Sequence, residues 1–260
     1  MAKANASDFD LLIKVVRDLE DFLPHLVLIG GWVPTLYVHF LWKEIMQEPL
    51  MTMDIDFGLR NMVFTGKETI SQRVTNKHYG EHHLELGKEI PFVPVVKSNK
   101  GARAELDFII DEKTPNDIRQ KLMGREIYVS ALPFVDVLLE NTIPIKLSEI
   151  LVNIPNPVQY VFHKLLTFTE RTPGVKKGKD LYYVYFVLRF HPDGDTFLKT
   201  VSRLIRDHPL GKTVKKNIRT YFRDAFSDGP TLIDEATKIS SLTALGTNIR
   251  EDALKRIRDL

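Results

Sequence analysis

Hydrophobic positions in the first 42 residues follow three successive patterns. Apolar side chains recur at helical spacing over residues 8–22, and a proline two residues later is expected to end that helix. Residues 25–29 form a short apolar run rich in strand formers, which predicts a buried strand. Gly30 and Gly31 follow, and helical spacing returns over residues 32–42. The pattern predicts a helix, a strand, a double-glycine turn and a second helix.

Two later segments alternate apolar and polar positions. Residues 53–59 and 102–108 are each expected to form a strand with one buried side and one solvent-facing side. The acidic residues of both segments fall on the solvent-facing side. Residues 60–100, 124–129 and 133–139 mix glycine, proline and charge with short apolar stretches, and they indicate further strands and loops whose limits the pattern does not fix.

From residue 157 onward the pattern becomes helical. Helical spacing covers residues 157–171, 179–190, 194–206 and 214–226, and two more segments before the end of the chain. A mixed front half followed by a helical back half predicts an α+β fold. We therefore expect an α/β domain over residues 1–153 and a helical domain over residues 154–260, joined by a linker at residues 154–157.

Composition excludes several classes of protein. The 260 residues include no cysteine, so disulfides, thiolate metal sites and cysteine nucleophiles are excluded, and any metal must bind to carboxylates, imidazoles or water. The formal net charge of +2 does not by itself require a nucleic-acid partner. No apolar run is long enough to span a bilayer, and the N-terminal residues lack the apolar centre of a signal peptide. We expect a soluble, cytoplasmic protein with no membrane partner.

Three aspartates are the candidate catalytic residues. Asp54 and Asp56 are separated by one residue on a predicted strand, so their side chains leave the same face with Cα atoms about 7 Å apart. If Asp107 faces the same way on a neighbouring strand, the three carboxylates could hold two metal ions about 4 Å apart, the spacing used in phosphoryl transfer. Glu105 shares the face of Asp107 and is the substitute candidate.

Magnesium suits such a cluster, because it prefers oxygen ligands and is usually completed by substrate phosphates. Gly30 and Gly31 let the backbone approach an anion such as a triphosphate closely. Taken singly, a pair of aspartates is common on a solvated strand face and a pair of glycines is only a turn. Their ordered combination with a later acidic strand is the specific signal.

The segments LIGGWVPTLYVHF, TMDIDFGL and AELDFII resemble the minimal nucleotidyltransferases of the polymerase-β superfamily, in particular the group that includes AbiEii-type abortive-infection toxins. The resemblance implies a polymerase-β-like core, a mixed sheet with flanking helices, before the helical region. It implies that Gly30 and Gly31 support a triphosphate and that Asp54 and Asp56 hold two Mg²⁺ ions, or Mn²⁺ in their place. Asp107 would complete the metal site and orient or deprotonate the attacking hydroxyl.

The chain departs from this pattern after the glycines, where many members of the superfamily have serine and this chain has Trp32. A second signature is similar to residues 157–183. There the resemblance implies that Lys164 points toward the nucleotide phosphates, and that Asp180 either orients Lys164 or begins the following helix. A cationic loop is expected beside them, formed by Arg171, Lys176, Lys177 and Lys179. Taken alone, these residues would more simply be solvated surface and a helix cap.

Two other polar stretches have simpler interpretations. The sequence HYGEHH contains His78, His82 and His83, but Gly80 interrupts the helix that a zinc site at this spacing would need, so we interpret it as a polar loop. Four basic residues could meet an RNA backbone, although a solvated face is the simpler interpretation: Lys212, Lys215, Lys216 and Arg219.

The resulting hypothesis is a metal-dependent nucleotidyltransferase. It would transfer a nucleoside monophosphate from a nucleoside triphosphate to a hydroxyl acceptor, which could be RNA such as a tRNA 3′ end, a protein or a small molecule. The AbiEii resemblance adds the role of a toxin paired with an antitoxin protein. The alternative is a non-catalytic nucleotide- or RNA-binding module that has kept the fold.

Overall fold

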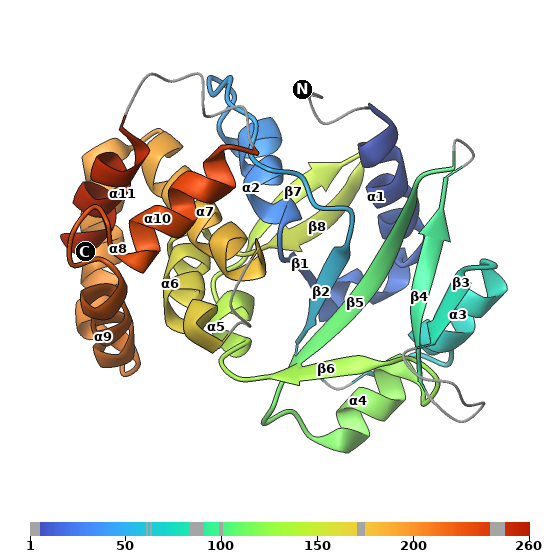
Figure 1. Ribbon diagram of the computed structural model, residues 1–260. Helices are drawn as coiled ribbons and strands as arrows, with labels where there is room; N and C mark the ends of the chain where they lie inside the picture. The colour runs from blue at the N-terminus through green and yellow to red at the C-terminus, as the bar shows by residue number, and fades with distance from the viewer. Residues whose placement is uncertain are drawn as a thin grey trace. The chain divides into compact units, whose positions relative to one another are not determined.

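The computed structural model describes residues 6–60, 62, 64–83, 91–98, 101–170, 175–239 and 248–260, without the side chains of residues 6–8 and 175–176. The chain divides into two compact units, each built from separate segments (Figure 1). The sheet unit contains Ala2–Val33 and Met51–Pro155, and the helical unit contains Pro34–Leu50 and Asn156–Leu260. That residues 1–153 and 154–260 are independent domains stays a prediction.

A mixed sheet forms the centre of the sheet unit. Its strands run in the order β1-β2-β5-β4-β3, and β6 also pairs with β5. The pairs β2–β5 and β5–β6 are parallel, whereas β1–β2, β3–β4 and β4–β5 are antiparallel. The bounds are β1 Leu26–Ile29, β2 Ile55–Leu59, β3 Gly80–His83, β4 Phe92–Lys97, β5 Arg103–Asp111 and β6 Val129–Leu132. The predicted α+β class is confirmed.

Side-chain alternation along β5 separates the two faces of the sheet. Ala104, Leu106, Phe108 and Ile110 are buried. Phe108 lies opposite Phe57 of β2 in the strand register, and their rings stack with centroids 5.9 Å apart. Residues between these positions face the other side, because successive side chains of a strand point in opposite directions. The predicted division into an apolar face and an acidic face is therefore confirmed.

Helices and a hairpin complete the sheet unit. Their bounds are α1 Ala6–Asp18, the 3₁₀ helix η1 Glu20–His25, α3 Ile70–Asn76, α4 Asn116–Met123, α5 Asp136–Leu139, and the hairpin of β7 Ile143–Leu147 with β8 Ile150–Ile154. The prediction that Pro24 ends a helix over residues 8–22 is wrong, because the α-helix stops at Asp18 and Pro24 lies inside η1. A 3₁₀ turn tolerates proline where it needs no N–H donor.

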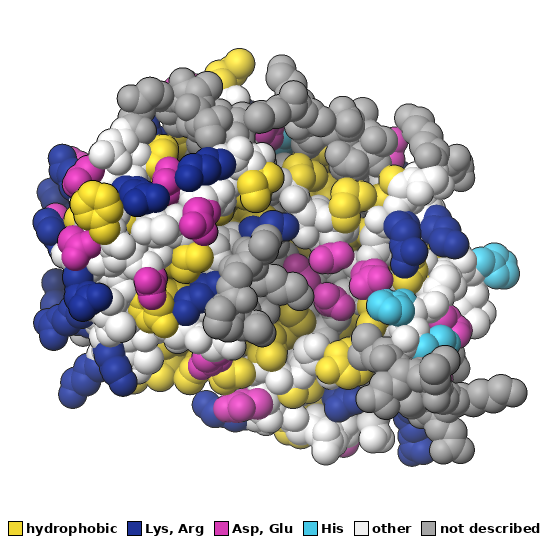
Figure 2. Space-filling view, in the orientation of Figure 1, with side chains coloured by type: hydrophobic (Ala, Val, Ile, Leu, Met, Phe, Trp, Pro, Cys, Tyr) yellow, Lys and Arg dark blue, Asp and Glu magenta, His cyan; other side chains and the backbone are white. Residues whose placement is uncertain are grey.

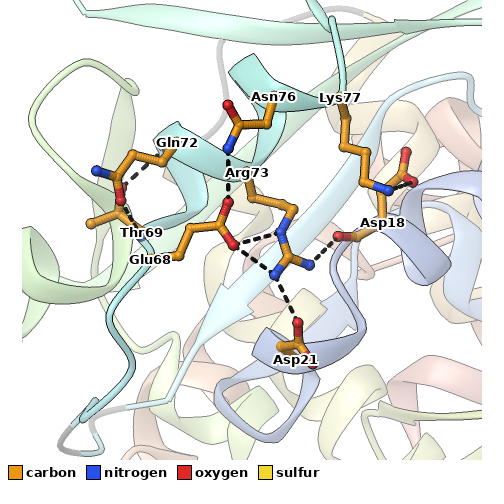
Figure 3. Close-up of polar contacts among 8 residues, drawn as sticks. All are labelled: Asp18, Asp21, Glu68, Thr69, Gln72, Arg73, Asn76 and Lys77. Atoms are coloured by element: carbon orange, nitrogen blue, oxygen red, sulfur yellow. Dashed lines mark hydrogen bonds and ion pairs between the residues drawn. The ribbon is translucent and has the colours of Figure 1, made fainter.

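Arg73 of α3 ties that helix to α1 and η1 (Figure 3). Its guanidinium donates to the Glu68 carboxylate through Nε and Nη2, at 2.9 and 2.7 Å, and to the Asp21 carboxylate at 2.7 Å. Nη1 donates to the backbone carbonyl of Asp18 at 2.9 Å, at the end of α1. The guanidinium also lies over the ring of Phe22. One side chain thus fixes the position of α3 on the N-terminal helices.

The helical unit is organised around α7. Every residue from Leu181 to Leu188 is buried, and a helix that is apolar on all sides is the centre of a bundle. The surrounding helices are α6 Pro157–Thr167, α8 Gly194–Asp207, α9 Gly211–Tyr221, α10 Asp228–Thr237 and α11 Ile249–Arg258, with α7 itself spanning Val175–Phe190. The predicted helical C-terminal region is confirmed.

An earlier segment completes this bundle. Helix α2 (Trp32–Leu36) begins directly after the double glycine and continues as the π-helix η2 (Tyr37–Leu41), and from Pro34 onward these residues belong to the helical unit. The buried Tyr37 ring lies edge-on to Tyr160 of α6, with centroids 6.0 Å apart. No helix within the described ranges has the length and apolar content needed to cross a membrane.

Candidate active site

Asp56 and Asp107 come together through the pairing of β2 with β5. Asp56 is the register partner of Asp107 in this parallel pair, and on its other side it is the partner of Ile29 in β1. Register partners on adjacent strands share a face, and the strands lie about 4.8 Å apart. Both aspartates are partly exposed, opposite the apolar face that holds Phe57 and Phe108. The predicted convergence of these two carboxylates is therefore present.

The Asp56 carboxylate lies against the backbone of Gly30. Gly30 has a φ of +76°, and a Cβ atom added there would lie 1.7 Å from Oδ2 of Asp56. Any side chain at position 30 would therefore occupy the space of the carboxylate. Because Gly30 directly follows β1, the pairing of β1 with β2 brings the double glycine and Asp56 to one place. Gly30 and Asp56, which are 26 positions apart in the sequence, form one cradle.

Further polar side chains lie on the same face of the sheet. Figure 2 shows acidic side chains gathered over β2 and β5, with a histidine at their edge. Glu105, two residues before Asp107, receives a contact from Nδ1 of His82 at 2.9 Å, and Nη2 of Arg103 lies 3.7 Å from the same oxygen. Glu105 is thus in contact with two basic side chains, His82 and Arg103.

Asp54 lies one residue before β2 and is exposed. Among the residues that the structure describes, no group of three His, Asp or Glu side chains could hold a metal ion by itself. Carboxylate pairs still suit Mg²⁺, since this ion usually binds one or two carboxylates and takes its other ligands from water and substrate phosphates. The donor set here, oxygen ligands beside a glycine cradle, fits a hard cation completed by a triphosphate.

Position 32, where a serine hydroxyl is common in the superfamily that this chain resembles, is part of the core. Trp32 is only 2% exposed, and its ring packs edge-on against Phe9 of α1 with centroids 5.5 Å apart. Its indole nitrogen has no hydrogen-bond partner among the described atoms. The departure from serine therefore replaces a polar hydroxyl with an aromatic ring, Trp32, that packs against Phe9.

Lys164 and Asp180, two predicted nucleotide-binding residues, form an ion pair inside the helical unit. The Lys164 ammonium donates to the Asp180 carboxylate, and both side chains are 8% exposed. Helix α7 begins at Val175, so Asp180 lies beyond its first turn. The interpretation in which Asp180 begins the helix is wrong, and its ion pair with Lys164 is the contact that the other interpretation, in which Asp180 orients Lys164, requires.

The predicted cationic loop is in part a helix. Lys177 and Lys179 lie on α7, and Lys177 is buried, with its Nζ 3.0 Å from the hydroxyl of Tyr221 and 4.3 Å from the centroid of that ring. This helix was predicted to begin at Lys179, because glycine, here Gly178, disfavours a helix interior, but α7 begins at Val175. The missing side chain of Gly178 leaves room for α10, where an added Cβ would lie 3.3 Å from the Leu232 carbonyl. Arg171 lies outside the described residues.

The interpretation of HYGEHH as a polar loop is also wrong in part. Residues Gly80–His83 form β3, the exposed edge strand paired with β4. His82 faces Glu105, whereas His83 lies 3.1 Å from Glu81. The four residues of β3, Gly-Glu-His-His, are all exposed or partly exposed and show no apolar alternation, so the sequence offered no signal for a strand here. The contact of His82 with the acidic face was not predictable, because it depends on the sheet order.

Comparisons with known proteins identify the family of this chain. A crystal structure of an antigenic nucleotidyltransferase-like protein from Paracoccidioides brasiliensis aligns with 81% of this chain and 93% of its own, with 16% sequence identity and a TM-score of 0.45. No curated protein matches the sequence. The family model described as nucleotidyltransferase matches residues 10–200, a span that holds the glycine cradle, the three aspartates and the Lys164–Asp180 pair. The chain therefore belongs to this nucleotidyltransferase family.

Proposed function

We propose that this protein transfers a nucleoside monophosphate from a nucleoside triphosphate to a hydroxyl acceptor, on the acidic face of the sheet unit. The observation that carries the proposal is the register pairing of Asp56 with Asp107, together with the contact between Asp56 and the backbone of Gly30. A carboxylate pair beside a close backbone approach is the arrangement that a metal-bound triphosphate needs.

In the proposed reaction the acceptor hydroxyl gives its proton to Asp107, and its oxygen forms a bond to the α-phosphorus. The bond from that phosphorus to the bridging oxygen breaks, and pyrophosphate leaves with the electron pair. Asp54 and Asp56 would hold the divalent metal ions, which supply charge neutralisation at the phosphates. The Gly30–Gly31 backbone would position the triphosphate, so that catalysis depends on orientation more than on covalent chemistry.

Lys164, Lys179, Asp180 and Arg171 are proposed nucleotide-binding residues of the helical unit. The ion pair with Asp180 supports this role, because it holds the Lys164 ammonium in one position from which a charge-assisted hydrogen bond to phosphate can form. The toxin role of AbiEii-type relatives, a protein antitoxin and a cytoplasmic location stay predictions.

The test is calorimetric titration of each of the four nucleoside triphosphates, with Mg²⁺, into wild-type protein and the variant Asp56→Asn. We expect metal-dependent binding of at least one nucleotide by the wild type, and loss of that binding in the variant. Transfer to an acceptor should fall on the order of 10²-fold or more. Asp117→Asn is the matched control, because Asp117 is an exposed carboxylate of α4.

Two outcomes would count against the proposal. Equal metal-dependent binding by wild type and Asp56→Asn would show that the acidic face is not part of the nucleotide site. Metal-dependent binding without transfer to RNA, protein or small-molecule hydroxyls would favour the alternative, a nucleotide-binding module that has kept the fold.

A further inference from the structure

Positive charge is concentrated in one short part of the helical unit. Residues 194–223, which cover α8 and α9, contain two aspartates and eight basic residues and so carry a net charge of +6, whereas the whole chain carries +2. The basic residues are Lys199, Arg203, Arg206, Lys212, Lys215, Lys216, Arg219 and Arg223. The rest of the chain is therefore net acidic, and the charge of this segment is local.

Three of these cations form a stripe along α9. Lys212, Lys216 and Arg219 are exposed and lie four and three residues apart, which places them on one face of the helix over about 10 Å. No ion pair joins any of the three to an aspartate or glutamate within the described part of the chain. Arg206, in contrast, is paired with its neighbour Asp207 at 2.8 Å. Lys and Arg side chains dominate the region over α9 at the lower left of Figure 2.

The opposite face of α9 packs into the helical unit and so keeps the stripe at the surface. Val214 and Ile218 are buried, and the Asn217 amide donates to the carbonyl oxygens of Leu165 and Leu166, at 3.1 and 3.0 Å, near the end of α6. These contacts fix the rotation of α9 about its own axis. The three cations are therefore held in one orientation on the surface of the helical unit.

An exposed aromatic ring follows the stripe in the sequence. Phe226 is 82% exposed, and it belongs to a hydrogen-bonded turn just after α9. Its backbone N–H donates to the Asp224 carboxylate at 2.9 Å, and the Ser227 hydroxyl donates to the same oxygen at 3.1 Å. These hydrogen bonds lower the pKa of Asp224, the backbone bond from Phe226 most of all, so the acid of this turn is already engaged. The ring is thus presented to solvent by an ordered turn.

We propose that the α9 stripe and Phe226 form a binding surface for single-stranded nucleic acid. Cations along a fixed face meet the phosphate backbone, and an exposed aromatic ring stacks on an unpaired base, which is the combination that single-strand binding uses. A duplex would offer phosphates but no free base face for Phe226. In a step that rests on the proposed function, the bound strand supplies the hydroxyl acceptor.

The experiment measures binding of labelled RNA and DNA single strands of about 12 nucleotides, and of a duplex of the same length, by fluorescence anisotropy at several salt concentrations. The stripe variant is Lys212→Gln/Lys216→Gln/Arg219→Gln. We expect its binding to weaken and the slope of log affinity against log salt to become shallower by about 2. Phe226→Ala should weaken single-strand binding roughly tenfold to a hundredfold and leave duplex binding unchanged.

Matched controls carry the same changes elsewhere. Lys121→Gln/Arg125→Gln/Lys146→Gln removes three exposed charges of the sheet unit, and Leu151→Ala truncates a side chain that is 65% exposed. Both should bind as the wild type does. Absence of binding at low salt, or equal loss in the stripe variant and its control, overturns the proposal. Preference for the duplex, or normal single-strand binding by Phe226→Ala, overturns the assignment to a single strand.

A transfer assay separates this inference from the proposed function. The bound oligonucleotide is incubated with Mg²⁺ and labelled nucleoside triphosphate, and incorporation of the label is measured. Incorporation that the stripe variant loses supports the strand as acceptor. Binding without incorporation supports the binding surface but overturns the assignment of the strand as acceptor. The variant Asp56→Asn retains the stripe and should bind the oligonucleotide as the wild type does.

Discussion

Gly30 meets two requirements at once, a positive φ and a close approach of the Asp56 carboxylate. An alanine there would carry the cost of a left-handed backbone, about 1–2 kcal/mol, and would also displace the carboxylate. We therefore expect Gly30→Ala to lower the free energy of unfolding and to lose metal-dependent nucleotide binding. Thermal unfolding and calorimetric titration measure the two effects.

Gly101→Ala is the control that separates these effects. Gly101 has a φ of +87°, and an added Cβ would meet nothing within 4 Å. This variant should lower the free energy of unfolding by the cost of the left-handed backbone alone, and it should bind nucleotide as the wild type does. Normal nucleotide binding by Gly30→Ala would mean that the contact between Gly30 and Asp56 has no role in the site.

The Lys164–Asp180 pair makes a prediction about stability. Removing one partner leaves a buried charge, so Lys164→Met should lower the free energy of unfolding by about 3–5 kcal/mol. The double variant Lys164→Met/Asp180→Leu removes both charges and should be more stable than the single variant. Urea unfolding of the two single variants and the double variant measures this. A double variant that recovers stability but not nucleotide binding would support the phosphate-binding role of Lys164.

At the residue scale, the sequence predicted the side chains of the acidic face better than their surroundings. Alternation along two strands was enough to place Asp56 and Asp107 on a polar face, because that pattern is local. The partners of Lys177 and His82 were not predictable. Lys177 was expected in a solvated loop, since lysine is rarely buried, and its contact with Tyr221 joins positions 44 residues apart.

At the scale of elements, the cluster around Arg73 and Asp18 predicts a pH dependence. Burial raises the pKa of Asp18, but hydrogen bonds from Lys14 and Tyr79 and the charge of Lys77 lower it more, so the pKa lies below its usual value. A carboxylate with a lowered pKa stabilises the fold above the pKa of the unfolded chain, and this contribution is lost as the pH falls through the lowered value.

We therefore expect Asp18→Asn to lower the free energy of unfolding by about 1–3 kcal/mol at pH 7 and to have a smaller effect below about pH 3.8. Urea unfolding of wild type and variant across this range measures the difference. Asp117→Asn, whose carboxylate is 67% exposed, should change little at any pH. A difference between wild type and Asp18→Asn that stays constant down to pH 2 would show that the charge of Asp18 does not stabilise the junction of α1 with α3.

Elements with a strong period were predicted, and short elements were not. The strands β1, β2 and β5 and the helices of the back half have patterns long or regular enough to recognise. The hairpin of β7 and β8 and the short helices α3 and α4, each of five to eight residues, were not predicted as separate elements. Helix α9 was expected over residues 214–226 but spans Gly211–Tyr221, since Gly211 closely approaches the Ile205 carbonyl and allows an earlier start.

At the scale of the whole molecule, the helical unit depends on a segment from the front of the chain. Tyr37 packs against Tyr160, and Trp42 lies edge-on to His191 with centroids 5.2 Å apart. Tyr182 and Tyr183 hydrogen-bond to the backbone of Leu50 at 3.2 Å. Residues 154–260 alone lack these partners and would leave large cavities in their core.

This arrangement tests the predicted division of the chain. A fragment of residues 154–260 should lack the near-ultraviolet circular dichroism and cooperative urea transition of a packed core, because losing a buried aromatic side chain costs about 3–5 kcal/mol. Joining residues 34–50 to the fragment through a flexible linker should restore both signals. A fragment that folds cooperatively by itself would instead support a helical domain over residues 154–260.

The same arrangement has a consequence for protein synthesis. Residues 34–50 are translated more than a hundred residues before Asn156, the first residue of the helices that cover them. At bacterial or eukaryotic elongation rates this interval lasts roughly 5 to 20 s. During that time Tyr37 and Trp42 belong to a nascent chain without the helices that bury them, so this segment can reach its final packing only after the residues from Asn156 onward have been synthesised.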